Sequence, residues 1–311
     1  MQRQRWVAPV ALTAALLAAL AGAWAAKNRM HPSGSAVDAI AGIDPNIPAK
    51  PIEWTTGYAS ALKRAKAENR LILVDFYTDW CGYCKKLDAE VYPTPQVQRV
   101  VNASFIPVRL NAEKEKDGIE QSVHFNVTGF PCILILDDAG NELYRIGGYM
   151  AAEPFTKSLV SMVAAARATP ELLARVKANP NDVDALGDLT EIYVGQHHPD
   201  KAQDILTRLT KVDPDNRSGK VSKATLQMGE MYLQDQDAEK AAPLLQRAAK
   251  IGKNGMEVGY AHISLALCAA IRNDKPAAIS ELQAVQATPD VPKELSDKAA
   301  QMLQRIQHAP S

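Results

Sequence analysis

Two cysteines separated by two residues, Cys81 and Cys84, are the most chemically distinctive feature of the sequence. They follow an apolar stretch that predicts a buried strand, and Cys84 opens a stretch that predicts a helix. The thiolate is the nucleophile of disulfide exchange, and the unpaired N–H groups at a helix N-terminus stabilise a thiolate placed there. The pattern predicts a redox-active dithiol. Cys81, at the exposed end, is expected to attack a substrate disulfide, and the more buried Cys84 to resolve the mixed disulfide.

A structural zinc site is the main alternative for two cysteines at this spacing. Such a site needs a second cysteine pair, or two histidines at ligand spacing. His197 and His198 are adjacent to each other and have no cysteine pair near them in the sequence. We interpret them as part of a polar turn. The sequence therefore favours redox chemistry, and we expect neither a metal nor another cofactor.

Asp75 is the single acid in an otherwise apolar run that predicts a strand. A buried carboxylate without a partner is costly and tends to stay protonated. Because this strand leads directly to the cysteines, Asp75 is a candidate carrier for the proton of Cys84. The alternative is a structural acid whose side chain reaches water or a backbone donor at the end of the strand.

Pro131 stands at the start of another apolar run that predicts a strand. A proline at such a position ends the hydrogen-bonded ladder and leaves backbone groups free. The bond between Phe130 and Pro131 could adopt the cis form, although few bonds of this type do.

The other two cysteines, Cys132 and Cys268, stand alone in the sequence. Cys132 begins a buried strand, and its simplest role is that of a small hydrophobic residue. The sharper hypothesis is a third thiol that modulates or traps the active-site disulfide. Cys268 lies in an alanine-rich helical stretch and is most simply a core residue.

The elements that must position these residues alternate between strand and helix patterns over residues 51–167. Apolar runs bounded by turn residues predict strands, and turn residues at 137–141 predict that the last two strands form a hairpin. The expected fold class is α/β, with a mixed sheet covered by helices on both faces. The predicted strands are 71–77, 105–110, 132–136 and 142–146, and the predicted helices are 58–68, 84–92, 96–102, 119–124 and 153–166.

Strand patterns stop at residue 168, and residues 168–311 contain a helical repeat. Thr169 and Pro170 predict the start of its first helix. The repeat resembles the tetratricopeptide repeat, with plain helical hairpins as the alternative. Its spacings of 39 and 37 residues exceed the roughly 34 residues of that family, so insertions are expected in the inter-repeat turns. A helix at 294–307 would cap the stack. Corresponding positions are Tyr193 and Tyr232, and Ala202, Ala241 and Ala278.

The motifs around the paired cysteines resemble, in order, those of the thioredoxin superfamily. More narrowly, residues 54–166 resemble the C-terminal periplasmic domain of the disulfide reductase DsbD. The motifs that carry this resemblance are Val74–Phe76, Tyr77–Cys84, Pro95–Gln98, Val108–Asn111 and Asn126–Pro131.

The resemblance implies roles for individual residues. Cys81 would be the nucleophile, Cys84 the resolving thiol and Asp75 the buried acid. It also implies that Pro131 is cis and that the Phe130 backbone holds the substrate peptide as an added strand. The residues expected to contact substrate are Trp80, Gly82, Tyr83, Phe130 and Pro131.

The first 26 residues have the pattern of a secretory signal, in which a basic start precedes the charge-free stretch 7–26 and small residues offer cleavage sites. The alternative is an uncleaved membrane tether through residues 7–26. Residues 27–50 predict a linker, because they mix Pro, Gly and Ser without a sustained period. In either case the remaining chain is expected in the periplasm or elsewhere outside the cytoplasm.

Charge and composition exclude other classes. Lys and Arg number 35, as do Asp and Glu, so no basic field is present to favour nucleic acid as a partner.

The expected function is a thiol:disulfide oxidoreductase that reduces disulfide-containing protein substrates, using electrons from an upstream thiol donor. The repeats are expected to recruit a protein partner. Two alternatives stay open. The Gly82–Tyr83 pair is similar to that of periplasmic disulfide isomerases, which leaves an oxidase or isomerase, and the thioredoxin-like domain could instead be only a docking module of an adaptor.

Overall fold

The computed structural model describes residues 48–308 of the chain. The predicted signal or tether lies outside the described residues, as does most of the predicted linker. The chain divides between Glu171 and Leu172 into two compact units. We call residues 48–171 the sheet unit and residues 172–308 the repeat unit. Within residues 48–308, no helix combines the length and apolar character that a membrane span requires.

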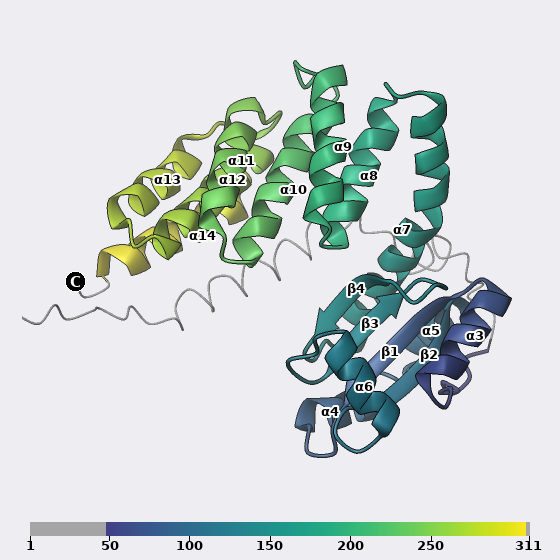
Figure 1. Ribbon diagram of the computed structural model, residues 1–311. Coiled ribbons are helices and arrows are strands. Elements are labelled where there is room, and N and C mark those ends of the chain that lie inside the picture. The colour runs from purple at the N-terminus through teal and green to yellow at the C-terminus, as the bar shows by residue number, and fades with distance from the viewer. Residues whose placement is uncertain (1–47, 309–311) are drawn as a thin grey trace, which may run out of the picture. The chain divides into compact units, whose positions relative to one another are not determined.

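A four-stranded mixed sheet forms the centre of the sheet unit (Figure 1). Its strand order is β2-β1-β3-β4. β1 runs parallel to β2 and antiparallel to β3, and β3 and β4 form the expected antiparallel hairpin. These strands lie where the sequence predicts them, within one residue at each end. They are β1 (Leu71–Tyr77), β2 (Phe105–Asn111), β3 (Cys132–Leu136) and β4 (Glu142–Gly147).

Helices cover both faces of this sheet, which explains why the central strands are apolar on both sides. On one face, Leu73 and Ile133 share a core with α4 (Gly82–Glu90), α5 (Pro95–Ser104) and α7 (Ala152–Ala178). On the other face, Val74 and Leu134 pack with α3 (Tyr58–Glu68) and with residues flanking α6 (Lys116–His124). The α/β fold class is therefore confirmed.

Helix α7 differs from the prediction, because it continues through Pro170 to Ala178 without a break. Thr169 does not begin a helix. It lies inside α7, where its hydroxyl donates a hydrogen bond to the carbonyl of Ala165, 2.8 Å away. An interior proline removes one backbone hydrogen bond. Here Leu172 and Val176, one turn apart, are buried beyond the proline, and this burial favours continuing the helix. The two compact units thus divide within α7, a few residues after the predicted boundary at 167.

The repeat unit is built entirely from helices (Figure 1). Three helical hairpins follow one another and α14 comes last, as the repeat pattern predicts. The hairpins are α8 (Val183–Gly195) with α9 (Pro199–Val212), α10 (Lys220–Gln234) with α11 (Ala238–Ile251), and α12 (Gly255–Ile271) with α13 (Lys275–Ala287), and α14 is Lys293–His308.

Equivalent positions of the three hairpins have equivalent environments, which confirms the repeat. The alanine at the fourth position of the second helix of each hairpin is buried, as is the leucine four residues later. Each hairpin also turns through one residue with positive φ. The alanines are Ala202, Ala241 and Ala278, the leucines are Leu206, Leu245 and Leu282, and the turn residues are His197, Gln236 and Asn273.

The expected insertion is present in only one of the two inter-repeat turns. Residues 213–219 form a long first turn, whereas the second turn, 252–254, is short. The extra residues of the third copy lie instead in α12, which at 17 residues is the longest helix of the three hairpins. Asn216 explains how the long turn is held, because its side-chain amide donates to the carbonyl of Ile251, 2.9 Å away, and its oxygen accepts from the Ser222 N–H.

Candidate active site

Cys81 and Cys84 form a disulfide at the N-terminus of α4. Cys81 is the N-cap residue, and its sulfur accepts a hydrogen bond from the Cys84 N–H, 3.0 Å away. The Cys81 carbonyl accepts from the Lys85 N–H and so begins the helix. The helix therefore directs an otherwise unpaired N–H group and the positive end of its dipole at the Cys81 sulfur. This is the environment that lowers the pKa of a thiol.

The expected difference in exposure between the two cysteines is absent. Cys81 is 3% exposed and Cys84 is 2% exposed. The two sulfurs are bonded to each other and therefore lie in the same environment. In the disulfide form, solvent exposure does not distinguish the attacking cysteine from the resolving one. What distinguishes the two is position, because only Cys81 occupies the N-cap and accepts the helix N–H.

Asp75 lies in β1 and is completely buried. This excludes the alternative in which its side chain reaches water. The prediction of an acid without a partner is also wrong, because the Arg109 Nε lies 3.1 Å from Asp75 Oδ2. Arg109 stands directly opposite Asp75 in the pairing of β1 with β2. Burial raises the pKa of Asp75 to about 6, and the charge of Arg109 lowers it in part.

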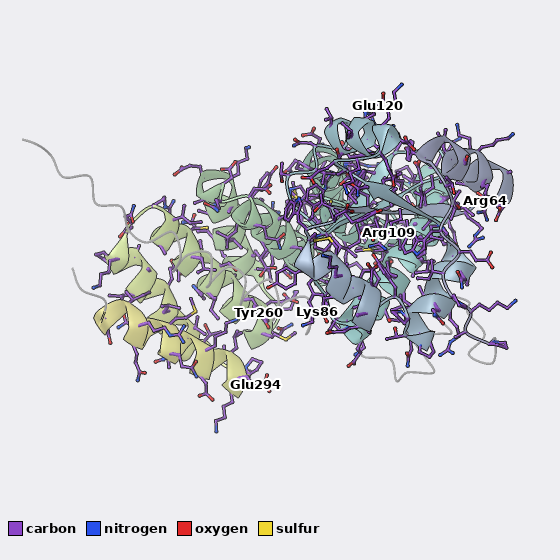
Figure 2. The ribbon with its side chains drawn as sticks, turned by 90° about the horizontal axis from the view of Figure 1, so that it is seen from below. Arg64, Lys86, Arg109, Glu120, Tyr260 and Glu294 are labelled. Atoms are coloured by element: carbon purple, nitrogen blue, oxygen red, sulfur yellow. A yellow bond between two sulfur atoms is a disulfide. The ribbon has the colours of Figure 1, made fainter. Side chains whose placement is uncertain are left out.

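Arg109, which is labelled in Figure 2, joins this buried acid to an exposed one. Its two terminal nitrogens each lie 2.9 Å from an oxygen of Asp88 on α4. The guanidinium also lies over the ring of Tyr77, 4.3 Å from its centroid. Sequence reasoning did not select Arg109 or Asp88 as site residues. The available signal was a single basic residue in an otherwise apolar strand, but the strand register that pairs it with Asp75 is not readable locally.

Replacing Arg109 by methionine is expected to raise the pKa of Asp75 by about 1–3 units, because an adjacent arginine favours the ionised carboxylate by that amount. Carbon-13 NMR of the Asp75 carboxyl during a pH titration measures the midpoint. Arg109→Lys, which keeps a charge but loses the two-pronged contact with Asp88, should give a smaller rise. An unchanged or lower midpoint in the methionine variant would show that Arg109 does not control this carboxyl.

The bond between Phe130 and Pro131 is cis, as the resemblance implies. Pro131 precedes β3, and its carbonyl accepts a hydrogen bond from Gly148, 2.9 Å away. Within residues 48–308, no hydrogen bond engages the backbone N–H or carbonyl of Phe130. These groups are therefore available to an added strand.

Trp80 and Tyr83 flank Cys81 in sequence and are the most exposed aromatic residues of the described chain, at 66% and 61%. The Trp80 ring contacts Phe130 edge to face, with centroids 6.1 Å apart. Its indole N–H donates to both carboxylate oxygens of Glu113, at 3.0 and 2.9 Å. A Cβ built on Gly82 would meet no atom within 4 Å, so the surface beside Cys81 is open at this position.

Cys132 has the surroundings of a core residue. It is a buried free thiol, it pairs with Phe76 and Gly147 across the sheet, and burial raises its pKa. An Arg145 nitrogen lies 3.8 Å from its sulfur. Cys268 is also buried, in α12, with its pKa raised to about 11. A modulating role for Cys132 stays a prediction.

Comparisons with known proteins find two family models that match successive segments of the chain. Residues 58–162 match the thioredoxin-like domain, and residues 165–224 match the tetratricopeptide repeat. Cys81, Cys84, Asp75 and Pro131 all lie inside the first match. Three helical hairpins are present in the structure, and the second match reaches only the first of them and the start of α10.

Individual relatives resemble the sheet unit. The thiol:disulfide interchange protein DsbD of Colwellia psychrerythraea is 30% identical over 104 residues, which is 32% of this chain and 17% of that protein. DsbD of Citrobacter koseri is 33% identical over 113 residues, 35% of this chain and 19% of that protein. The reduced C-terminal domain of Neisseria meningitidis DsbD aligns with 34% of this chain and 98% of that domain, at 21% identity and a TM-score of 0.29. The chain thus spans less than a fifth of the length of these curated relatives.

Proposed function

We propose that this thioredoxin-like thiol:disulfide oxidoreductase, with its tetratricopeptide repeats, reduces disulfides of protein substrates outside the cytoplasm. The observation that carries the proposal is the hydrogen bond from the Cys84 N–H to the Cys81 sulfur at the N-terminus of α4. A dithiol in this position has one sulfur stabilised as an anion and a second within bonding reach.

The first step is attack by the Cys81 thiolate on one sulfur of the substrate disulfide. A bond forms between Cys81 and that sulfur, and the substrate disulfide bond breaks to release the other substrate sulfur as a thiolate. The helix N-terminus supports the negative charge on Cys81 before attack. The free backbone groups of Phe130 would hold the substrate chain as an added strand beside the reacting sulfur.

The second step regenerates the disulfide seen in the structure. Cys84 loses its proton and attacks the Cys81 sulfur. The bond between Cys81 and the substrate then breaks, and the substrate sulfur that Cys81 had attacked leaves as a thiolate. We assign Asp75 as the acceptor of the Cys84 proton. It is buried on the same face of β1 as Leu73, which packs with α4, and Arg109 links it to Asp88 of that helix. Its pKa of about 6 suits a base near neutral pH. An upstream thiol donor then returns two electrons to the Cys81–Cys84 disulfide.

The reduction potential of the Cys81–Cys84 pair tests the direction of the reaction. Equilibration with glutathione or dithiothreitol, followed by mass spectrometry of the alkylated thiols, gives the value. A reductase requires a potential below that of the substrate disulfides it opens, so we expect a value more negative than about −200 mV. A potential near about −120 mV, as in a strong oxidant, would contradict the proposal and favour the oxidase alternative.

Location outside the cytoplasm is supported by the charge-free stretch at residues 7–26 and by the similarity of the sheet unit to DsbD proteins. The repeats are assigned to partner recruitment. Stacked helical hairpins present an extended surface to a protein, and holding a partner near the dithiol raises its effective concentration.

A chain ending at Glu171 should fold and reduce a small aromatic disulfide at the rate of the full chain. The residues of α7 that pack on the sheet, among them Phe155 and Val163, all precede this end. The same chain should lose about tenfold or more in rate on its protein partner, because effective concentration is lost. Thermal unfolding and parallel assays on both substrates check this. Equal rates on both substrates would remove the recruitment role, and an unfolded chain would show that the repeats are needed for the fold.

A further inference from the structure

Two exposed aromatic side chains lie beside Cys81. Both of the aromatic residues among the large exposed hydrophobic ones of the described chain, Trp80 and Tyr83, flank this cysteine. Exposed aromatic groups are costly in water and are enriched where proteins bind partners. The remaining exposed large hydrophobic residues of the described chain are Ile119, Val123, Leu173 and Met256.

Tyr83 is stacked on Tyr149, a residue distant in sequence that lies between β4 and α7. Their ring centroids are 6.1 Å apart and their planes differ by 27°. The Tyr149 hydroxyl donates to Glu90 Oε2, 2.8 Å away, and the Lys86 ammonium lies 4.5 Å from the centre of the Tyr149 ring. Tyr83, Lys86 and Glu90 lie along one side of α4, because they are three and four residues apart. Tyr149 is therefore held against the active-site helix by three separate contacts.

The charged groups beside the two tyrosines and Trp80 lie near groups of opposite sign. Lys86 lies 3.7 Å from Glu90, and Glu113, which accepts from the neutral Trp80 indole, interacts with the charge of Lys114. Asp79, just before Cys81, is paired with Lys114. Paired charges give little net field, so this surface offers a charged partner no strong attraction. This surface instead offers a partner the aromatic rings of Trp80, Tyr83 and Tyr149 for apolar contact.

We propose that Tyr83 and Tyr149, which we call the tyrosine shelf, form a specificity site that binds a large apolar side chain next to the reacting cysteine of the substrate. This inference rests on the proposed function and adds the class of substrate sequence that the site prefers. A fixed ring loses little conformational entropy when a second apolar group packs on it, and such contacts favour aromatic, leucine and methionine side chains.

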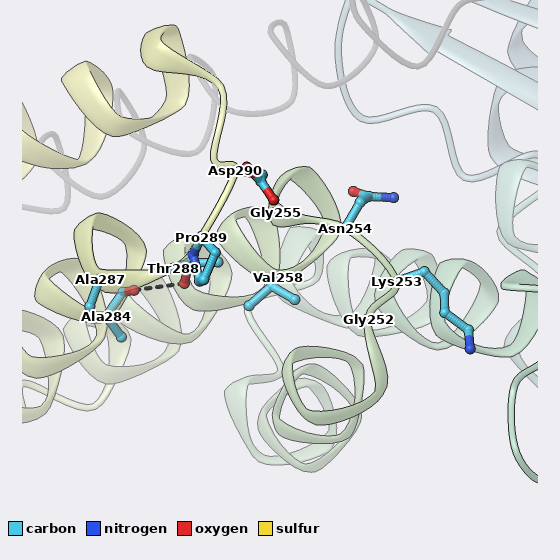
Figure 3. Close-up of a pocket in the computed structure, with 10 residues that line it drawn as sticks. All are labelled: Gly252, Lys253, Asn254, Gly255, Val258, Ala284, Ala287, Thr288, Pro289 and Asp290. Atoms are coloured by element: carbon cyan, nitrogen blue, oxygen red, sulfur yellow. Dashed lines mark hydrogen bonds between the residues drawn. The ribbon is translucent and has the colours of Figure 1, made fainter.

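A pocket in the repeat unit supports no comparable inference (Figure 3). It lies where the turn before α12 meets the segment after α13. Two of its polar side chains already serve the helices. Asn254 caps α12 by accepting from the Glu257 N–H, and the Thr288 hydroxyl donates to the carbonyl of Ala284.

Two synthetic peptides, each with one intramolecular disulfide, test the shelf. They differ in a single residue beside the more accessible cysteine, which is phenylalanine in one and serine in the other. For the full-length wild type we expect kcat/KM to favour the phenylalanine peptide by about five- to tenfold. In Tyr149→Ala this ratio should fall towards one. Tyr149→Phe keeps the ring and loses only the bond to Glu90, so it should retain most of the preference.

Tyr83→Ala provides a second variant, because this exposed side chain contributes little to the fold, and it should also reduce the ratio. A wild type that reduces both peptides equally would overturn the shelf while leaving the proposed function standing. The same holds if Tyr149→Ala and Tyr83→Ala both keep the full preference. A wild type that reduces neither peptide, nor any protein disulfide, would instead contradict the proposed function.

Discussion

Replacing Cys81 by serine is expected to abolish reduction of a protein disulfide, whereas replacing Cys84 by serine is expected to accumulate mixed disulfides. A serine hydroxyl does not ionise near neutral pH, so Cys81→Ser loses the attacking anion and should lose about a thousandfold or more in rate. In Cys84→Ser the attack survives, but no thiol remains to release the substrate. Non-reducing electrophoresis and mass spectrometry of the adducts distinguish the two variants.

Cys132→Ser provides the matched control for this experiment, because Cys132 is a third cysteine of the same unit but lies in β3, outside the Cys81–Cys84 disulfide. The double variant Cys84→Ser with Cys132→Ser should trap the same adducts as Cys84→Ser alone. Equal trapping by the Cys81 and Cys84 variants would contradict the assigned roles. Loss of adducts in the double variant would show that Cys132 takes part in the exchange.

Replacing Asp75 by asparagine is expected to stabilise the protein at pH 7 and to slow its turnover. The folded pKa of about 6 lies above the ordinary value of 3.8, so ionising this carboxyl costs more in the folded chain than in the unfolded one. The cost is absent below about pH 4, grows as the pH rises to about 6, and is constant above that. At pH 7 it amounts to roughly 3 kcal/mol, which asparagine avoids.

Urea unfolding of the disulfide form at pH 4 and pH 7 measures this effect. The gain in free energy of unfolding should appear at pH 7 and vanish at pH 4. Asp88→Asn, at the exposed end of the same network, is the control and should show a much smaller gain. A variant that is no more stable at pH 7 than the wild type would mean that Arg109 fully compensates the buried charge.

Turnover reports on the other role of Asp75. If this carboxylate accepts the Cys84 proton, Asp75→Asn should slow release of the mixed disulfide while leaving alkylation of Cys81 by iodoacetamide largely intact. Unchanged turnover across neutral pH would return Asp75 to a structural role.

Local sequence patterns were sufficient for most elements of the sheet unit. Leu71–Tyr77 is apolar on both faces because the strand is central and covered on both sides, and such a run is visible without any tertiary information. Pro170 shows the limit of such patterns. A proline suits the first turn of a helix, but burial of Leu172 and Val176 carries α7 through it. Whether these two side chains are buried depends on the folded structure and is not readable from the local sequence.

Only some of the site residues were predictable from the sequence. The cysteines, Asp75 and Pro131 are readable because each stands out against its own surroundings. Arg109 and Tyr149 are not, because their significance comes from strand register and from a loop that returns to α4. Residues that complete a site from elsewhere in the chain need the fold before they can be recognised.

Because the residue opposite Asp75 is an arginine, the buried cluster around Asp75 can exchange only one proton near neutral pH. A guanidinium keeps its proton at every pH at which proteins are folded. Tyr92 is a third ionisable group in this cluster, because it is buried and interacts with both Asp75 and Arg109. Burial raises its pKa well above the usual range. Asp75 is then the one member of this trio that exchanges a proton near neutrality. When a single group must lose its proton, the logarithm of the rate rises with pH with a slope of one. The rate at which Cys84 resolves the mixed disulfide should therefore rise tenfold per pH unit below about pH 6 and level off above it.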